Sequence, residues 1–256
     1  MATRPPPLRL AALLMAITLS GGRAAEYFVT PQGDDARDGL SREQAFRTLQ
    51  KGLDALQAGD TLTIGPGEYV GGVVRRELGT LEVDTRIRAD LAGTVLVRGD
   101  VDAPPFEPVA GERNLYVAAF TQDVHMVSEA DTLRTLGERP TVQDVAFTPG
   151  SFYADTAAGR LYISPTDLRP AAAHRYAIAV TGGHGIHLVQ PRRVIVEGLA
   201  ARGFHSLAPL PDPNPQNVPW GIYLSKPTRC IIRHCTAFLN GGGILIASGP
   251  PGGGGN

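Results

Sequence analysis

The C-terminal third of the chain contains an internal repeat, and this repeat constrains the fold more than any other feature. The stretch GIHLVQPRRVIVEGLAARGF (residues 185–204) aligns without a gap on GIYLSKPTRCIIRHCTAFLN (residues 221–240). Seven of the twenty aligned positions are identical at an offset of 36 residues, and a further start, GILI, follows Gly221 by 22 residues. Self-similarity at a fixed period indicates structural units that stack on one another.

A unit of about 22 residues is typical of one coil of a parallel β-helix. The offset of 36 then divides into a coil of 22 and an excess of 14 residues, which we assign to the loop HSLAPLPDPNPQNVPW (residues 205–220). Its five prolines and lack of periodicity exclude a ladder strand. The period-two alternation of strands predicts the inward side chains. These are Ile186, Leu188, Val194, Val196 and Leu199, matched by Ile222, Leu224, Cys230, Ile232 and Cys235.

The two cysteines therefore stack on apolar residues of the preceding coil. Cys230 lies one repeat after Val194, and Cys235 one repeat after Leu199. This favours two free thiols that act as small apolar side chains. A local disulfide between them is the alternative.

The first 25 residues have the three parts of a secretory signal peptide. Arg4 and Arg9 precede the apolar run LAALLMAITL, and small residues at Gly22 and Ala24 form a cleavage site. Ten apolar residues are too few to span a bilayer. We expect a secreted or periplasmic protein with no membrane contact after cleavage, and the net charge of -1 gives no reason to expect nucleic acid as a partner.

After the signal peptide, residues 27–30 form a β-prone run, and residues 41–57 have helical apolar spacing. We predict one amphipathic helix over 41–57, capped by Ser41 and ended by Gly59. A strand over 61–64 and a turn at Gly65-Pro66-Gly67 follow.

The segments YFVTPQGDDARDG, AFRTLQKGLDAL and AGDTLTIGPGEY resemble the N-terminal cap of right-handed parallel β-helix proteins in the pectate-lyase-like superfamily. The resemblance covers residues 26–74. It implies that a strand and a helix close the first coil, and that residues 86–88 and 94–98 are strands of the next. It also implies a polysaccharide or oligosaccharide partner, bound in a groove along one parallel sheet.

Residues 104–177 interrupt the coil pattern. Within them, FTPGSFYADTAAGRLYISPTD predicts a hairpin with strands at 151–154 and 160–164. The predicted fold is therefore all-β: a right-handed parallel β-helix with a capping strand and helix and an inserted small β subdomain. We divide the chain into a signal peptide (1–25), the cap and first coils (26–103), the inserted subdomain (104–177) and further coils (178–256).

The chain ends in GPPGGGGN, and nothing in it caps the last coil. Because open strand edges need to be covered, we expect the chain to be part of a longer protein and inactive alone. A native glycine-rich linker is the alternative.

A lyase needs a base and a cation beside a uronate carboxylate, whereas a glycosidase needs paired carboxylates. No motif fixes either set. The candidate catalytic residues are Lys226, Arg229 and His205, and the candidate substrate-binding residues are Tyr223, Trp220 and Asp212.

Four of these candidates also have a purely structural interpretation. Lys226 precedes Pro227 in a turn, Arg229 repeats Arg193 one coil earlier, and Trp220 can fasten the proline-rich loop. Tyr223 matches His187 on the outward side of a strand.

No metal-ligand motif is present, and the alternation rule predicts that His184 and His187 face opposite sides. Calcium is the one cofactor candidate, in the loop GDDARDG (residues 33–39) with its three aspartates, although a solvated turn is favoured there.

These features predict a secreted polysaccharide lyase or glycoside hydrolase. A non-catalytic carbohydrate-binding or surface protein on the same scaffold is the alternative.

Overall fold

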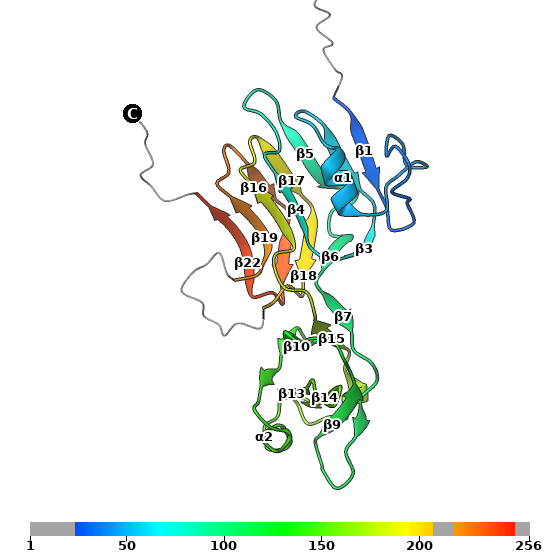
Figure 1. The fold of residues 1–256 in the computed structure, drawn as a ribbon, viewed down its shortest axis with the longest axis vertical. Coiled ribbons are helices and arrows are strands. Elements are labelled where there is room, and N and C mark those ends of the chain that lie inside the picture. Colours follow the sequence, from blue (N-terminus) through cyan, green and yellow to red (C-terminus); the bar gives the residue numbers. More distant parts are fainter. Residues whose placement is uncertain (1–23, 207–217, 249–256) are drawn as a thin grey trace, which may run out of the picture.

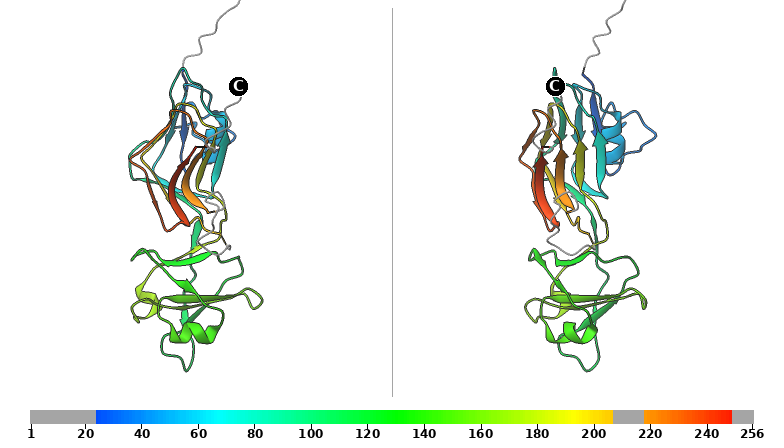
Figure 2. Two further views of the ribbon diagram at one scale, coloured as in Figure 1. Left: turned by 90° about the vertical axis from the view of Figure 1, so that its left-hand side faces the viewer. Right: turned by 60° about the vertical axis from the view of Figure 1, so that its left-hand side comes forward.

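The structure, a computed structural model, describes residues 24–206 and 218–248. It is predominantly β, with three all-parallel sheets and two further sheets that contain antiparallel strands. Figures 1 and 2 show the parallel sheets side by side at one end of the molecule and the other two sheets at the opposite end.

The chain visits the three parallel sheets in rotation, so that each repeat contributes one strand to each sheet. Sheet A contains β1 (Glu26–Val29), β2 (Thr61–Ile64), β5 (Thr85–Ala89), β17 (Val194–Glu197) and β20 (Ile231–Arg233). Sheet B contains β3 (Gly67–Val70), β6 (Val95–Arg98), β18 (Leu199–Arg202) and β21 (Thr236–Phe238). Sheet C contains β4 (Val73–Arg76), β16 (Ile186–Val189), β19 (Trp220–Ser225) and β22 (Gly242–Ala247).

The strand register confirms the period read from the sequence. Ile186 pairs with Ile222, 36 residues later, and Ile222 pairs with Ile244, 22 residues later. The excess of 14 residues therefore lies between β18 and β19, where the proline-rich loop was expected. Residues 207–217 of that loop are outside the described residues.

The predicted inward side chains pack together in one apolar core. Those of the earlier repeat are buried, whereas Cys230, Ile232 and Cys235 of the last repeat are partly buried against the same core. Both cysteines are free thiols, as the stacking argument favoured. Burial raises the pKa of each thiol, which suits their use as small apolar side chains.

The helix prediction over 41–57 is wrong in its first half. The helix α1 covers only Leu49–Ala55, and Thr48 rather than Ser41 caps it by accepting a hydrogen bond from the Lys51 backbone N–H. The preceding residues form bends and a turn around an isolated bridge between Phe46 and β1. In this bridge the Phe46 N–H donates to the Phe28 carbonyl, and the Phe46 carbonyl accepts from Thr30. The apolar residues at helical spacing are therefore buried in two different ways. Phe46 is buried at its bridge to β1, and Leu49 and Leu53 are buried on the helix.

The chain leaves sheet B after β6 and returns before β16. Between them, sheet D contains β7 (Asp100–Asp102), β10 (Met126–Glu129), β11 (Arg134–Thr135) and β15 (Tyr176–Ala179). Sheet E contains β8 (Glu107–Pro108), β9 (Tyr116–Ala119), β12 (Gly137–Glu138), β13 (Ser151–Asp155) and β14 (Arg160–Ser164). The helix α2 (Val142–Phe147) and a 3-10 turn (Ala171–Ala173) complete this part.

The predicted hairpin is present as the antiparallel pair β13–β14. This inserted part also has its own apolar core, separate from that of the parallel sheets. Within the described residues, no helix has the length and apolar character needed to cross a bilayer.

The ladder of inward side chains predicts a large difference between two leucine truncations. Leu188→Ala removes a fully buried side chain between neighbouring strands of sheet C and should lower the free energy of unfolding by about 2–5 kcal/mol. Leu91→Ala makes the same chemical change at an exposed loop position and should cost about 0.5 kcal/mol or less. Urea unfolding followed by circular dichroism measures both, and equal losses would contradict the assigned core.

Candidate functional site

The outer face of sheet C brings Tyr223, a predicted substrate-binding residue, into contact with His187. Because Ile186 and Leu188 in β16, and Ile222 and Leu224 in β19, point inward, His187 and Tyr223 point outward. The two are register partners. Their rings stack with centroids 4.7 Å apart and an interplanar angle of 13°.

His184 completes a three-ring group, here called the ring cluster (His184, His187 and Tyr223). Its ring centroid lies 4.7 Å from that of His187 and 4.8 Å from that of Tyr223. Its Nδ1 accepts a hydrogen bond from the Trp220 backbone N–H at 3.1 Å. The prediction that His184 and His187 face opposite sides is therefore wrong, because His184 precedes β16 and does not follow the alternation of the strand.

Both histidines of the ring cluster are neutral near pH 7. Burial lowers the pKa of His184, and burial together with the nearby His184 and Arg76 lowers that of His187 to about 4. The Nε2 atom of His187 lies 3.3 Å from the Ser225 hydroxyl. Tyr223 is only 3% exposed, so the two half-buried imidazoles form the accessible part of the cluster. Neutral imidazole can accept a proton or hydrogen-bond a hydroxyl group.

Lys226 and Arg229 lie outside the ring cluster, at exposed turn positions with φ of 51° and 53°. The same left-handed conformation occurs one repeat earlier, at Gln190 and Arg193, with φ of 54° and 49°. Recurrence at the same point of the repeat indicates that these positions shape the turns.

Of the remaining candidates, His205 and Trp220 belong to the described residues. The His205 carbonyl lies 2.8 Å from His125 Nδ1, its own Nδ1 lies 3.0 Å from the Ser206 carbonyl, and burial lowers its pKa. Trp220 begins β19, and its ring leaves no room for a side chain at Gly242. Asp212 is outside the described residues.

The aspartates of the predicted calcium loop accept hydrogen bonds from the chain itself. Asp35 accepts from the backbone N–H groups of Arg47 and Thr48 and from the Thr48 hydroxyl. Asp34 and Asp38 each accept from a backbone N–H two residues later. Among the described residues, no three His, Cys, Asp or Glu side chains are placed to hold a metal ion.

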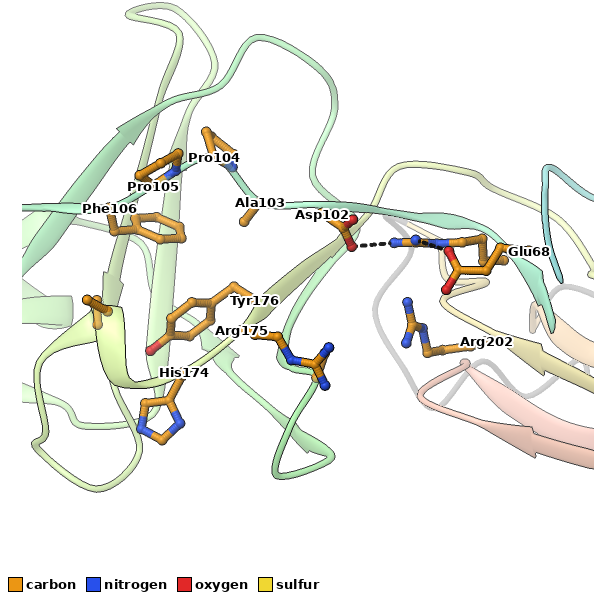
Figure 3. Close-up of a pocket in the computed structure, with 14 residues that line it drawn as sticks. Glu68, Asp102, Ala103, Pro104, Pro105, Phe106, His174, Arg175, Tyr176 and Arg202 are labelled. Atoms are coloured by element: carbon orange, nitrogen blue, oxygen red, sulfur yellow. Dashed lines mark hydrogen bonds and ion pairs between the residues drawn. The ribbon is translucent and has the colours of Figure 1, made fainter. Parts of the chain in front are cut away.

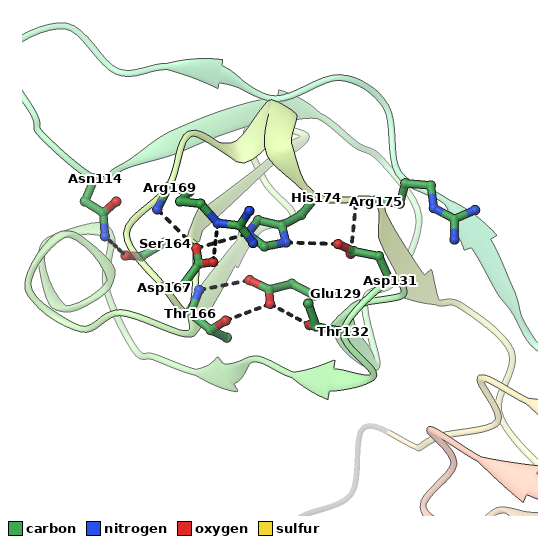
Figure 4. Close-up of polar contacts among 10 residues, drawn as sticks. All are labelled: Asn114, Glu129, Asp131, Thr132, Ser164, Thr166, Asp167, Arg169, His174 and Arg175. Carbon is green, nitrogen blue, oxygen red and sulfur yellow. Dashed lines mark hydrogen bonds and ion pairs between the residues drawn. The ribbon is translucent and has the colours of Figure 1, made fainter.

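A polar cluster in the inserted part escaped the sequence reasoning altogether (Figure 4). The side chain of His174 is fully buried, with Nδ1 3.2 Å from Asp131 and Nε2 3.0 Å from Asp167. Nearby, the buried Glu129 carboxylate accepts hydrogen bonds from Thr132 and from the backbone and hydroxyl of Thr166. The cluster joins Glu129 and Asp131 to Thr166 and His174, which lie 37 and 43 residues later in the chain, and no local motif links the two segments.

Several solved structures are similar to this chain, and two of them are described here. One, described as the complex of XylC with xylose, matches with a TM-score of 0.58 and 15% identity, over 81% of this chain and 40% of that one. A glycoside hydrolase matches with a TM-score of 0.59 and 12% identity, over 83% of this chain and 61% of that one. The chain shares its fold with these proteins.

At such identities the likeness concerns the fold alone, and the chain spans less than two thirds of either neighbour's length. No protein-family model matches the chain. No curated protein matches it by sequence.

The environment of His174 predicts a pH-dependent stability. Burial alone would lower the pKa of His174, but its hydrogen bonds to Asp167 and Asp131 raise it above the usual value. A raised folded-state pKa contributes stability that is fully present below the unfolded value of about 6.5 and is lost as the pH rises through the folded value. The free energy of unfolding should therefore fall from pH 6 toward higher pH.

The matched control is His174→Gln, whose amide keeps a hydrogen-bond donor but does not titrate. Urea unfolding of both proteins across this range measures the difference between them. Parallel pH profiles would contradict the assigned pairing of His174 with the two carboxylates.

Proposed function

We propose that the chain is the N-terminal part of a secreted carbohydrate-active protein, a polysaccharide lyase or glycoside hydrolase, that binds an extended glycan over the outer face of sheet C. We further propose that sheets A, B and C are the sides of a right-handed parallel β-helix. The rotation of the chain through three parallel sheets supports the second statement. The shared fold with a glycoside hydrolase and with a xylose complex supports the first.

The ring cluster is the observation that carries the proposal. Aromatic rings offer an apolar surface to the C–H faces of sugars, and neutral imidazoles exchange hydrogen bonds with hydroxyl groups. Here His184 and His187 supply both properties on the outer face of a parallel sheet, next to the buried Tyr223.

The residues of this face favour a lyase over a hydrolase. Within the described strands of sheet C, no Asp or Glu is present to form the carboxylate pair that glycoside hydrolysis requires. His187 instead offers a neutral base, and Arg76, whose charge contributes to lowering the pKa of His187, offers the cation.

In this mechanism His187 removes the proton beside a uronate carboxylate. The electron pair left on that carbon forms a C=C bond as the C–O bond at the adjacent carbon breaks. The departing oxygen takes a proton from solvent, and Arg76 stabilises the negative charge that develops on the carboxylate. The product is an unsaturated uronate that absorbs ultraviolet light.

The test uses the exported protein that carries this chain, with polygalacturonate, alginate and xylan as substrates. Ultraviolet absorbance detects unsaturated uronates, and reducing-end release detects hydrolysis. We expect absorbance to increase and His187→Ala to lower the rate about 10²–10⁴-fold. Because the base has a pKa of about 4, the rate should rise as the pH passes about 4 and then level off.

The matched control is His234→Asn, which replaces an exposed histidine at a left-handed turn position with a residue that tolerates that conformation. It should leave the rate unchanged. Release of reducing ends without an increase in ultraviolet absorbance would indicate a hydrolase and not a lyase. Retention on a glycan without products would favour a binding protein, and neither products nor retention would reject a carbohydrate function.

A further inference from the structure

A concave site lies away from the ring cluster, where sheet B meets the inserted part. It is a cleft of about 490 Å³, a volume within the range of small-molecule sites, which often form where two structural units meet. Figure 3 shows its two walls. One wall carries Glu68, Arg98, Asp102 and Arg202, and the other carries Phe106, Arg175 and Tyr176.

The charged wall of the cleft is held by a network of ion pairs around Arg98. Arg98 donates from Nε to Asp100 at 2.7 Å, from Nη2 to Asp102 at 2.8 Å and from Nη1 to Glu68. Arg202 donates to both oxygens of Asp100 at 2.7 and 3.0 Å. The side chains of Arg98 and Asp100 are only 8% and 2% exposed, so both are used by the fold itself.

Three charged side chains around the cleft still have atoms that can hydrogen-bond to a ligand. The side chains of Asp102 and Glu68 are 84% and 54% exposed, and each contacts Arg98 through only one of its two oxygens. The hydrogen bond from Arg98 lowers the pKa of Asp102, which keeps that carboxylate ionised. Arg175 is exposed, and none of the described side chains accepts a hydrogen bond from its guanidinium group.

The charges of the side chains around the cleft indicate which class of ligand it can bind. Three guanidinium groups (Arg98, Arg175 and Arg202) and two carboxylates (Glu68 and Asp102) line the cleft. The third positive charge is balanced by the buried Asp100, which is not part of the lining but pairs with both Arg98 and Arg202. An anionic ligand would meet the two exposed carboxylates, and a cationic one would meet Arg175. A neutral ligand rich in hydroxyl groups satisfies both, because carboxylates accept from hydroxyls and guanidinium groups donate to them.

The opposite wall suits the apolar face of such a ligand. Phe106 packs edge-on against Tyr176, with ring centroids 5.3 Å apart. Pro104 and Pro105 extend this wall beside them (Figure 3). Charged hydrogen-bonding groups opposite an aromatic and proline surface match the two faces of a sugar ring.

We propose that this cleft binds a short neutral saccharide. The site lies between sheet B and the inserted part. Its binding of a saccharide does not depend on glycan binding or catalysis at the ring cluster of sheet C.

The test uses the full chain with xylobiose as the neutral probe and digalacturonate as the anionic one, measured by isothermal titration calorimetry. We expect Arg175→Gln and Asp102→Asn each to weaken xylobiose binding about tenfold, since each removes a charge-assisted hydrogen bond. Arg160→Gln is the matched control, because Arg160 is an exposed arginine of the inserted part that does not line the cleft. It should leave binding unchanged. Melting curves for each variant establish that it is folded.

Unchanged xylobiose binding in folded Arg175→Gln and Asp102→Asn would overturn the proposal, as would tighter binding of digalacturonate at the cleft. His187→Ala separates the two sites. If it abolishes all sugar binding while the cleft variants have no effect, the cleft proposal fails and the sheet C proposal stands. If the cleft variants weaken binding and His187→Ala does not, the cleft binds sugar independently of sheet C.

Discussion

The parallel sheets depend on ladders of inward apolar side chains that run across successive repeats. In sheet A, Leu62, Ile87, Val196 and Ile232 are register partners in turn, each one strand further along. Burying such side chains supplies the main stabilisation of the sheets, and it also fixes their register, since a slip of one residue would expose a whole ladder. Because the register of the strands is fixed, the positions of the outward side chains relative to one another are fixed as well.

The geometry of the ring cluster follows from this register. Neighbouring strands lie about 4.7–4.9 Å apart, and two planar side chains at paired positions must stack at about that separation. His187 and Tyr223 do so, with centroids 4.7 Å apart. The inward ladder therefore holds the outward rings in contact without a dedicated hydrogen bond between them. The same stacking removes Tyr223 from solvent, and burial keeps the two imidazoles neutral.

The sequence predicted what depends on periodicity and missed what depends on pairing between distant segments. The offset of 36 residues was enough to place Ile222 opposite Ile186, and Cys235 after Leu199. Apolar spacing alone could not show that Phe46 belongs to a bridge with β1 and not to the helix, because both arrangements bury it. His184 was misplaced because the alternation rule holds only within a strand. The contact between His174 and Asp131 could not be predicted from the sequence, because Asp131 lies 43 residues away in the chain.

At the junction between sheet B and the inserted part, the buried carboxylate of Asp100 has a structural role. Asp100 follows Arg98 by two residues, at the point where the chain leaves sheet B, and it accepts hydrogen bonds from arginines of two successive strands. Gly203 makes this possible: its φ is +79°, and a side chain at this position would collide with the Asp100 carboxylate. A buried ion pair is a weak source of stability, but removing one partner leaves an uncompensated charge. The network therefore fixes the direction in which the inserted part departs, and with it the shape of the cleft.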